Sequence, residues 1–159
     1  MPAQIDPPRI IHTDRKTTAA IRLTIPRQDM MKAFGPAVGE LMAALAAQGV
    51  KPDSAVFAHH LTLSPEFFDF ELGVEVAAPI AATGRVTASE LPAARIARTV
   101  YSGPYEGLPA AWHAFDAWVK DNGHVPANRL WEVYAIGPQS TSDPAGWRTE
   151  LNRPLLDER

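Results

Sequence analysis

Residues 101–126 read YSGPYEGLPAAWHAFDAWVKDNGHVP and contain the start, the face and the end of one helix. Pro109 suits a first helical turn, where the N–H that proline lacks would have no partner. Gly123 suits the helix end, because glycine readily adopts the left-handed conformation that follows a last turn. Between them, apolar residues recur at the spacing of a single helical face: Trp112, Phe115 and Val119.

Residues 30–52, MMKAFGPAVGELMAALAAQGVKP, repeat this pattern. Pro36 suits a first turn, Gly49 suits the helix end, and Pro52 follows three residues later, as Pro126 follows Gly123. One strand-like stretch precedes each helical stretch and two follow it. These strand-like stretches are residues 17–25, 55–63 and 68–76 in the first half, and 94–102, 128–137 and 147–155 in the second.

The repeated order predicts an α+β fold. We expect duplicated β-α-β-β units that form a shared antiparallel sheet, with two main helices on one face and a ligand cleft at the pseudo-twofold axis. Half one should cover about residues 10–80 and half two about 92–156, both inside a single domain of residues 10–159. Neither half is large enough to bury a core alone. Residues 1–9 are expected to form a flexible lead-in.

Composition narrows the function. The chain has 159 residues, a formal net charge of −3 and 15 scattered Lys and Arg residues, so we expect no direct binding to nucleic acid. The absence of cysteine excludes disulfides and thiol catalysis. The N-terminus lacks a signal-peptide pattern, and no apolar stretch approaches the roughly 20 residues of a membrane span. We therefore expect a cytoplasmic protein without a membrane partner.

Acidic and aromatic residues gather in the last two strand-like stretches. Side chains alternate along a strand, so Glu132 and Tyr134 share one face of theirs, and Glu150 and Asn152 share one face of theirs. We expect these four side chains to face the cleft. The alternating apolar sets should pack under the helices; they are Trp131 and Val133 in one strand, and Trp147, Thr149 and Leu151 in the other.

A carboxylate among aromatic rings suits a flat, hydrophobic ligand that is cationic or donates hydrogen bonds. If desolvated, the same carboxylate would have a raised pKa and could act as a general acid or base. The alternatives are that Glu132 and Glu150 are solvated on an open sheet face, and that Trp112 belongs to the core. The predicted ligand-binding residues are Glu150, Tyr134, Glu132, Tyr101, Tyr105, Trp112, His60 and Phe68.

No metal or cofactor is expected. His59 and His60 are adjacent on a predicted strand, so they point to opposite faces and cannot hold one metal ion there. His60 corresponds to Tyr134 in the repeat, which is why it is included among the ligand-binding residues. The glycines of residues 101–108 lack the spacing and the lysine of a phosphate-binding loop.

The chain resembles the GyrI-like family of small-molecule-binding domains over roughly residues 17–155. The segments that carry this resemblance are YSGPYEGLPAAWHAFDAWV, NGHVP, LWEVYAIGP and WRTELNRPL in the second half and FDFELGVEV in the first. The resemblance implies a bacterial protein with a ligand cleft between the two halves. It also implies a glutamate on the last strand, matched by Glu150, as in the effector-binding domains of multidrug-sensing activators.

Three functions remain open from the sequence. The first is a stand-alone, multidrug-type binder of flat, hydrophobic small molecules, cationic ones included. The second, suggested by the resemblance, is a hydrolase that opens cyclopropane rings of DNA-alkylating natural products, with Glu150 and Glu132 as catalytic residues. The third is a protein-interaction or toxin-protection role, such as gyrase modulation. A homodimer, or a separately encoded regulator as partner, is compatible with each.

Overall fold

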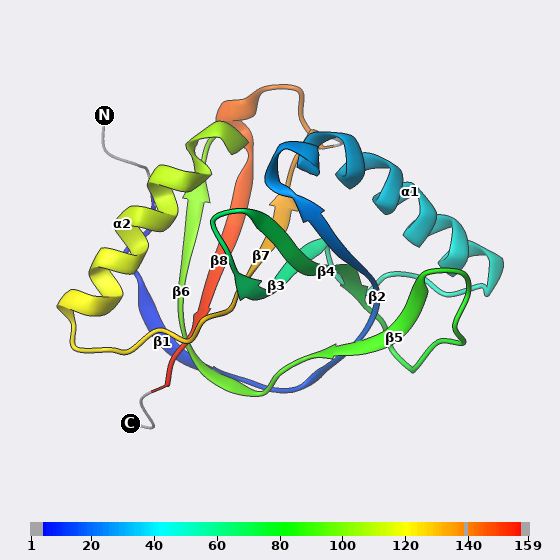
Figure 1. Cartoon of the computed structure of the whole chain (residues 1–159), viewed down its shortest axis with the longest axis horizontal. Helices are drawn as coiled ribbons and strands as arrows, with labels where there is room; N and C mark the ends of the chain where they lie inside the picture. Colours follow the sequence, from blue (N-terminus) through cyan, green and yellow to red (C-terminus); the bar gives the residue numbers. More distant parts are fainter. Residues whose placement is uncertain (1–4, 139, 157–159) are drawn as a thin grey trace. The chain divides into compact units, whose positions relative to one another are not determined.

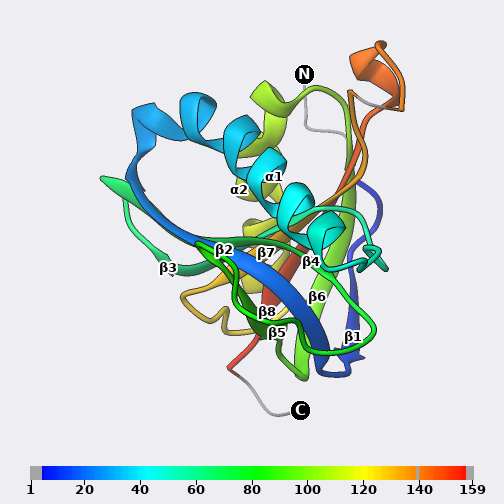
Figure 2. The same ribbon diagram turned by 90° about the vertical axis from the view of Figure 1, so that its right-hand side faces the viewer.

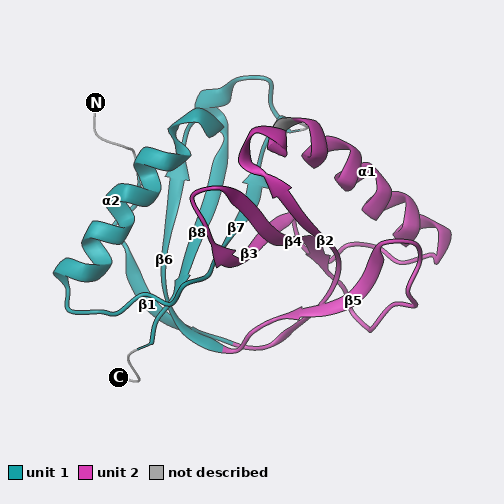
Figure 3. Cartoon of the chain, viewed as in Figure 1, with its two compact units in different colours: residues 1–13, 94–159 teal, residues 14–93 magenta. Residues whose placement is uncertain are grey.

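The computed structural model describes residues 5–138 and 140–156, which fall into two compact units. Unit 1 comprises Met1–Thr13 and Ala94–Arg159, and unit 2 comprises Asp14–Ala93 (Figure 3). Each unit contains one α-helix and strands that pair antiparallel, so the chain has the predicted α+β fold.

Unit 2 is built around helix α1. Its elements are β2 (Lys16–Pro26), η1 (Arg27–Asp29), α1 (Met30–Ala47), β3 (Phe57–Leu63), β4 (Phe67–Glu75) and β5 (Val86–Leu91). Its strands lie in the order β3-β4-β2-β5, all antiparallel (Figure 1). Helix α1 lies against β2 and β4 (Figure 2). The core of unit 2 includes the aromatic residues Phe57 of β3 and Phe70 of β4, which are fully buried.

Unit 1 is built around helix α2. Its elements are β1 (Arg9–Thr13), β6 (Ala94–Ser102), η2 (Tyr105–Gly107), α2 (Leu108–Asp121), β7 (Leu130–Ile136), η3 (Pro144–Gly146) and β8 (Arg148–Pro154). Its strands lie in the order β1-β6-β8-β7, again antiparallel. Helix α2 packs onto this sheet through one buried cluster: Ala97, Tyr101, Ala111, Phe115, Val119 and Leu151.

The predicted helix ends are confirmed, and one predicted helix start is wrong. Gly49 and Gly123 have φ values of 69° and 79°, the left-handed conformation that follows a helix. Pro109 lies in the first turn of α2. Pro36, however, lies inside α1, which begins at Met30. The residues before Pro36 are mostly good helix formers, so the helix extends past the point where the proline alone indicated a start.

The two units share the order strand, helix, strand, strand, and they also share a register. Leu72 in β4 lies between Ile21 and Ala58, as Leu151 in β8 lies between Thr99 and Glu132. One residue earlier in each strand, Glu71 and Glu150 therefore occupy equivalent positions. This equivalence supports the repeat found in the sequence; its origin by duplication stays a prediction.

The N-terminal segment is part of unit 1. Residues 1–4 of the expected lead-in lie outside the described residues. Ile5 forms an isolated bridge with Tyr101, and the amide of Asp6 donates to the carbonyl of Val100. Strand β1 then pairs with β6, although the sequence assigned residues 10–13 to half one. In the described part of the chain, neither α-helix combines the length and apolar character needed to cross a membrane.

Candidate functional site

Tyr101 shapes the loop that carries Tyr105. Its side chain is 5% exposed at the end of β6, and its hydroxyl donates to the carbonyl of Pro104 at 2.8 Å. Gly103 has a φ of 138°, a backbone conformation that residues other than glycine rarely adopt. A Cβ on Gly107 would collide with the Tyr101 hydroxyl. The sequence SGPYEG thus needs both glycines, and Tyr101, predicted as a ligand contact, lies in the core.

Glu132 is the buried carboxylate of unit 1. Only 8% of the residue is exposed. Its Oε2 accepts a hydrogen bond from Trp112 Nε1 at 2.6 Å, and its Oε1 accepts one from the Tyr134 hydroxyl at 2.8 Å. Burial raises the pKa of Glu132, and these two donors oppose the rise. In residues 5–138 and 140–156, the side-chain partners of Glu132 are these two neutral groups.

The two aromatic donors of this carboxylate pack against further aromatic rings. The Tyr105 ring meets Tyr134 edge-on at 5.8 Å between centroids and lies tilted against Trp147 at 4.8 Å. Trp112 packs against Phe115 at 5.6 Å. Burial raises the pKa of Tyr105 and raises that of Tyr134 well above its ordinary value, so both hydroxyls remain donors at neutral pH. We call Tyr105, Trp112, Tyr134 and Trp147, with Glu132, the ring cluster.

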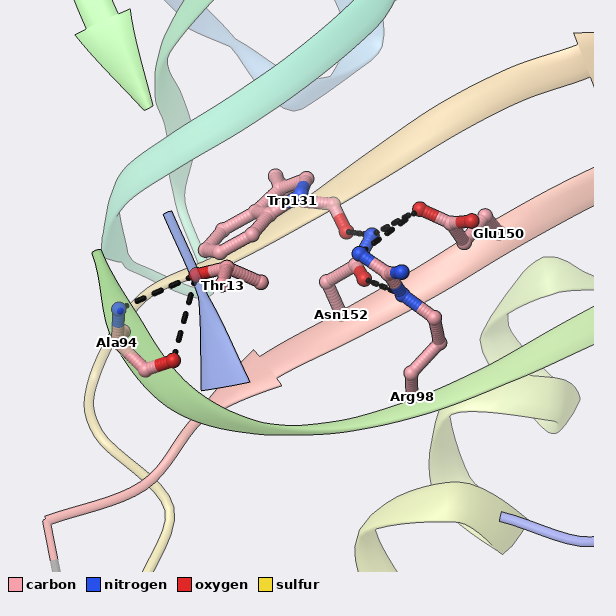
Figure 4. Close-up of polar contacts among 6 residues, drawn as sticks. All are labelled: Thr13, Ala94, Arg98, Trp131, Glu150 and Asn152. Atoms are coloured by element: carbon pink, nitrogen blue, oxygen red, sulfur yellow. Dashed lines mark hydrogen bonds and ion pairs between the residues drawn. The ribbon is translucent and has the colours of Figure 1, made fainter. Parts of the chain in front are cut away.

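Glu150 has a different environment. Its Oε1 lies 3.3 Å from Arg98 Nη2 and accepts from Asn152 Nδ2 at 3.2 Å (Figure 4). Arg98 Nε in turn donates to Asn152 Oδ1 at 2.7 Å, and Asn152 Nδ2 also contacts the carbonyl of Trp131 at 3.3 Å. The Arg98 and Glu150 side chains are 21% and 28% exposed. The charge of Glu150 is therefore balanced within the chain.

The two glutamates lie on opposite faces of the unit 1 sheet, which corrects the prediction that both share one face. Glu132 pairs with Leu151, and Val133 pairs with Glu150. Directly opposed residues share a face, so Glu132 lies with Leu151 under α2 and Glu150 lies on the other side. Trp131 pairs with Asn152 and was likewise misassigned. Alternation relates residues within one strand, whereas the register between strands relates one strand to the next.

His60 and Phe68 belong to a separate group in unit 2. His60 is 6% exposed, stacks on Phe70 at 5.1 Å and meets Phe68 edge-on at 5.4 Å. The Arg27 guanidinium lies 4.4 Å from the Phe68 ring centroid and donates to the carbonyl of Ser64. Burial, followed by the Arg27 charge, lowers the pKa of His60 to about 4. This histidine is therefore neutral at pH 7.

The sequence set of ligand residues omitted Trp147 and Arg98. Trp147 precedes β8 and joins the ring cluster through Tyr105. The sequence could have identified Trp147 as a ligand-binding candidate, because it is an aromatic residue two positions before Thr149. Arg98 lies in the interior of strand β6, and its partners Glu150 and Asn152 lie far along the chain, where no local pattern points to them. Among the described residues, no three His, Asp or Glu side chains gather closely enough to hold a metal ion.

The chain matches the model of one protein family. The model of the GyrI-like small molecule binding domain covers residues 6–155. No curated protein sequence matches the chain.

Solved structures share the fold at low sequence identity. The C-terminal domain of EcmrR is 22% identical, with a TM-score of 0.82 and 99% of each chain covered. In the EcmrR–DNA complex the TM-score is 0.81 and identity 22%; the match covers 95% of this chain and spans only 57% of the EcmrR chain.

Two further structures are more distant. A hydrolase from Listeria innocua is 12% identical, with a TM-score of 0.65 and 93% and 91% of the two chains covered. SAV2435, solved bound to tetraphenylphosphonium, is 10% identical, with a TM-score of 0.65 and 94% of each chain covered. At these identities, all of these structures show a common fold alone.

Proposed function

This chain belongs to the family of GyrI-like small molecule binding domains, and on that basis we propose that it binds flat, hydrophobic, cationic molecules at the ring cluster of unit 1. Glu132 supplies the negative charge in this proposal. The observation that carries it is a buried carboxylate whose described partners are two neutral donors.

A ligand cation would compensate the cost of burying this charge. An ionised carboxylate away from water is unfavourable unless a positive group or several donors stabilise it. A planar cation that enters the ring cluster brings its charge to Glu132. It also buries its faces against aromatic rings, whose π-electrons attract cations. The raised pKa of Glu132 is consistent with a carboxylate that lacks such a partner in the free protein.

Glu150 is the weaker candidate for this role. Arg98 already balances its charge, so a ligand cation would compete with a guanidinium that is held in place by Asn152. The proposal therefore assigns the main electrostatic contact to Glu132, although the family resemblance pointed to Glu150.

Isothermal titration with tetraphenylphosphonium and with the planar dye rhodamine 6G tests the proposal. Tetraphenylphosphonium is the ligand in the SAV2435 structure, and rhodamine 6G supplies a planar aromatic cation. We expect Glu132→Gln to weaken binding about tenfold or more, because the substitution removes the charge and keeps the shape. Glu150→Gln should change affinity less than about threefold. Glu90→Gln, at an exposed residue paired with exposed Arg15, is the matched control.

Full binding by Glu132→Gln would contradict the proposal. A large loss in Glu150→Gln alone would return the electrostatic role to the opposite face of the sheet. Absence of binding to the wild-type protein by any cationic probe would remove cation binding altogether.

Hydrolysis is a second candidate, favoured by the hydrogen bond between Glu132 and Tyr134. A carboxyl group with a raised pKa, held beside a tyrosine hydroxyl, is an arrangement used in general acid–base catalysis. Water would add across the strained bond of a cyclopropane, one carbon taking the hydroxyl group and the other the proton. Incubation with a cyclopropane-containing alkylator, followed by mass spectrometry for a water adduct, tests this. An adduct that forms no faster than in buffer, or equally with Glu132→Gln, would exclude it.

A further inference from the structure

Thr149 carries a buried hydroxyl without a hydrogen-bond partner in residues 5–138 and 140–156. The residue is 0% exposed, and within the described part of the chain its Oγ1 has no hydrogen-bond partner. Buried polar groups in folded proteins nearly always have a partner, so each exception calls for an explanation. Donor groups are left unpaired more rarely than acceptors. Thr149 therefore offers an unused donor inside unit 1.

The strand register places this hydroxyl beside the ring cluster. On one side, Thr149 pairs with Tyr101 of β6. On the other, the pairing of β8 with β7 is irregular, because Glu150 pairs with Val133 while Arg148 pairs with Ile136. Two residues of β7, Tyr134 and Ala135, thus lie opposite Thr149 alone, which is the arrangement of a β-bulge. Bulges of this kind are frequent beside functional sites, where they redirect a side chain.

Thr149 also lies on the Glu132 face of the sheet. Leu151, two residues later on the same strand, pairs directly with Glu132. Tyr134 reaches Glu132 from the bulge through its hydroxyl. Thr149, Tyr134 and Glu132 therefore present their side chains to one side, under helix α2.

The Tyr105 ring packs against two side chains that neighbour Thr149. Trp147 precedes Thr149 by two residues and has an extended backbone, with φ −73° and ψ 145°, so its ring lies on the same face. Tyr105 contacts Trp147, two residues before Thr149, and Tyr134, one of the two β7 residues in the bulge opposite Thr149. Tyr105 itself belongs to the short turn η2, outside the strands. The ring that contacts these two neighbours of Thr149 is therefore carried by a loop.

We propose that Thr149 is a binding residue of this site and donates a hydrogen bond to an acceptor atom of a ligand whose ring takes the place of the Tyr105 ring. The inference rests on the proposed function and narrows it. The ligand is a planar cation that also carries an ether or carbonyl oxygen. Its ring packs against Trp147 and Tyr134, its positive charge faces Glu132, and its oxygen meets Thr149.

The experiment compares N-methylquinolinium with the positional isomers of its ring-methoxylated derivative, each of which carries one added methoxy group with an ether oxygen. Affinities are measured by calorimetry for the wild-type protein and three variants. Thr149→Val replaces the hydroxyl by a methyl group of similar size. Thr149→Ser keeps the hydroxyl. Thr18→Val is the matched control, because Thr18 in unit 2 is also 0% exposed and its Oγ1 also lacks a partner among the described residues.

We expect at least one methoxy isomer to bind the wild type more tightly than the parent cation. Thr149→Val should weaken that isomer about fivefold and leave the parent cation unchanged, which is the effect of one hydrogen bond. Thr149→Ser should retain most of the preference, and Thr18→Val all of it. Circular dichroism confirms that each variant folds.

The outcomes separate this inference from the proposed function. If the cations bind and depend on Glu132, but no isomer depends on the Thr149 hydroxyl, the inference alone is wrong. If Thr18→Val lowers the preference as Thr149→Val does, the effect is not local and the inference is also wrong. If neither the parent cation nor any isomer binds the wild type, the proposed function fails and the inference fails with it.

Discussion

The indole nitrogen of Trp112 lies 2.6 Å from a carboxylate oxygen of Glu132, so one hydrogen bond joins helix α2 to strand β7. Trp112, the α2 residue that the sequence predicted to bind a ligand, is therefore hydrogen-bonded to Glu132, the buried carboxylate of the ring cluster. Hydrogen bonds to charged groups contribute more than neutral ones, and loss of a donor leaves the acceptor without a partner.

Replacement of Trp112 by phenylalanine removes this donor and retains an aromatic ring. We expect the free energy of unfolding to fall by about 1–3 kcal/mol, because Glu132 then stays buried with one donor instead of two. Urea denaturation measures the change. Trp118→Phe, the same substitution on the same helix, is the control and should cost less. Equal losses in both variants would show that the Trp112–Glu132 bond has no special contribution.

Binding of a cation to Glu132 should depend on pH. Burial raises the pKa of this carboxyl above its ordinary value, so it loses its charge at a higher pH than an exposed glutamate does. Affinity for the planar cation rhodamine 6G should therefore fall as the pH is lowered through the raised pKa of Glu132. Titrations from pH 8 to pH 4 test this, and Glu132→Gln should show a flat profile. A wild-type profile as flat as that of the variant would contradict the assignment.

His60 should make the fold sensitive to acid. Its pKa is about 4 in the folded protein, where burial and Arg27 disfavour its charged form, and about 6.5 in an unfolded chain. Between these values only the unfolded state takes up the proton, so stability is full above pH 6.5 and falls as the pH drops toward 4. The contribution of His60 to the free energy of unfolding that is lost over this range is about 3 kcal/mol.

Urea denaturation across this pH range compares the wild type with His60→Phe, whose ring suits the contacts with Phe68 and Phe70. The variant should lose less stability on acidification. His113→Gln, at an exposed residue of α2, should retain the wild-type slope. Parallel acid slopes for wild type and His60→Phe would show that another group is responsible.

Two glycine substitutions should have opposite effects. Gly107→Ala places a methyl group against the Tyr101 hydroxyl, which is held by the carbonyl of Pro104, so it should destabilise the protein by about 1–3 kcal/mol. Gly39→Ala, in α1 with no neighbour near the added carbon, should stabilise it by roughly 0.5–1 kcal/mol. Thermal denaturation measures both. A neutral Gly107→Ala would show that the Tyr101 ring moves without cost.

Local signals were sufficient for the two helix ends and for six strands in their order, but they did not predict β1 and β5. Gly49 and Gly123 mark the helix ends because a left-handed residue after the last turn is a requirement of the backbone at that point. The alternation of Glu132 with Tyr134 was also readable, since side chains two apart on a strand share a face. The error at Pro36 arose because a proline can be tolerated inside a helix whose preceding residues favour it.

The sequence by itself determined the two helices, the six strands β2, β3, β4, β6, β7 and β8, and which side chains within each of these strands lie together. Only the tertiary structure decided that Glu132 lies under α2 with Trp112, while Glu150 lies on the opposite face with Arg98. The physical reason is that strand register depends on backbone hydrogen bonds between segments distant in sequence. A shift of one residue in the pairing of β7 with β8 would move every side chain of one strand to the other face relative to its neighbour. The amino-acid pattern within either strand does not indicate this register.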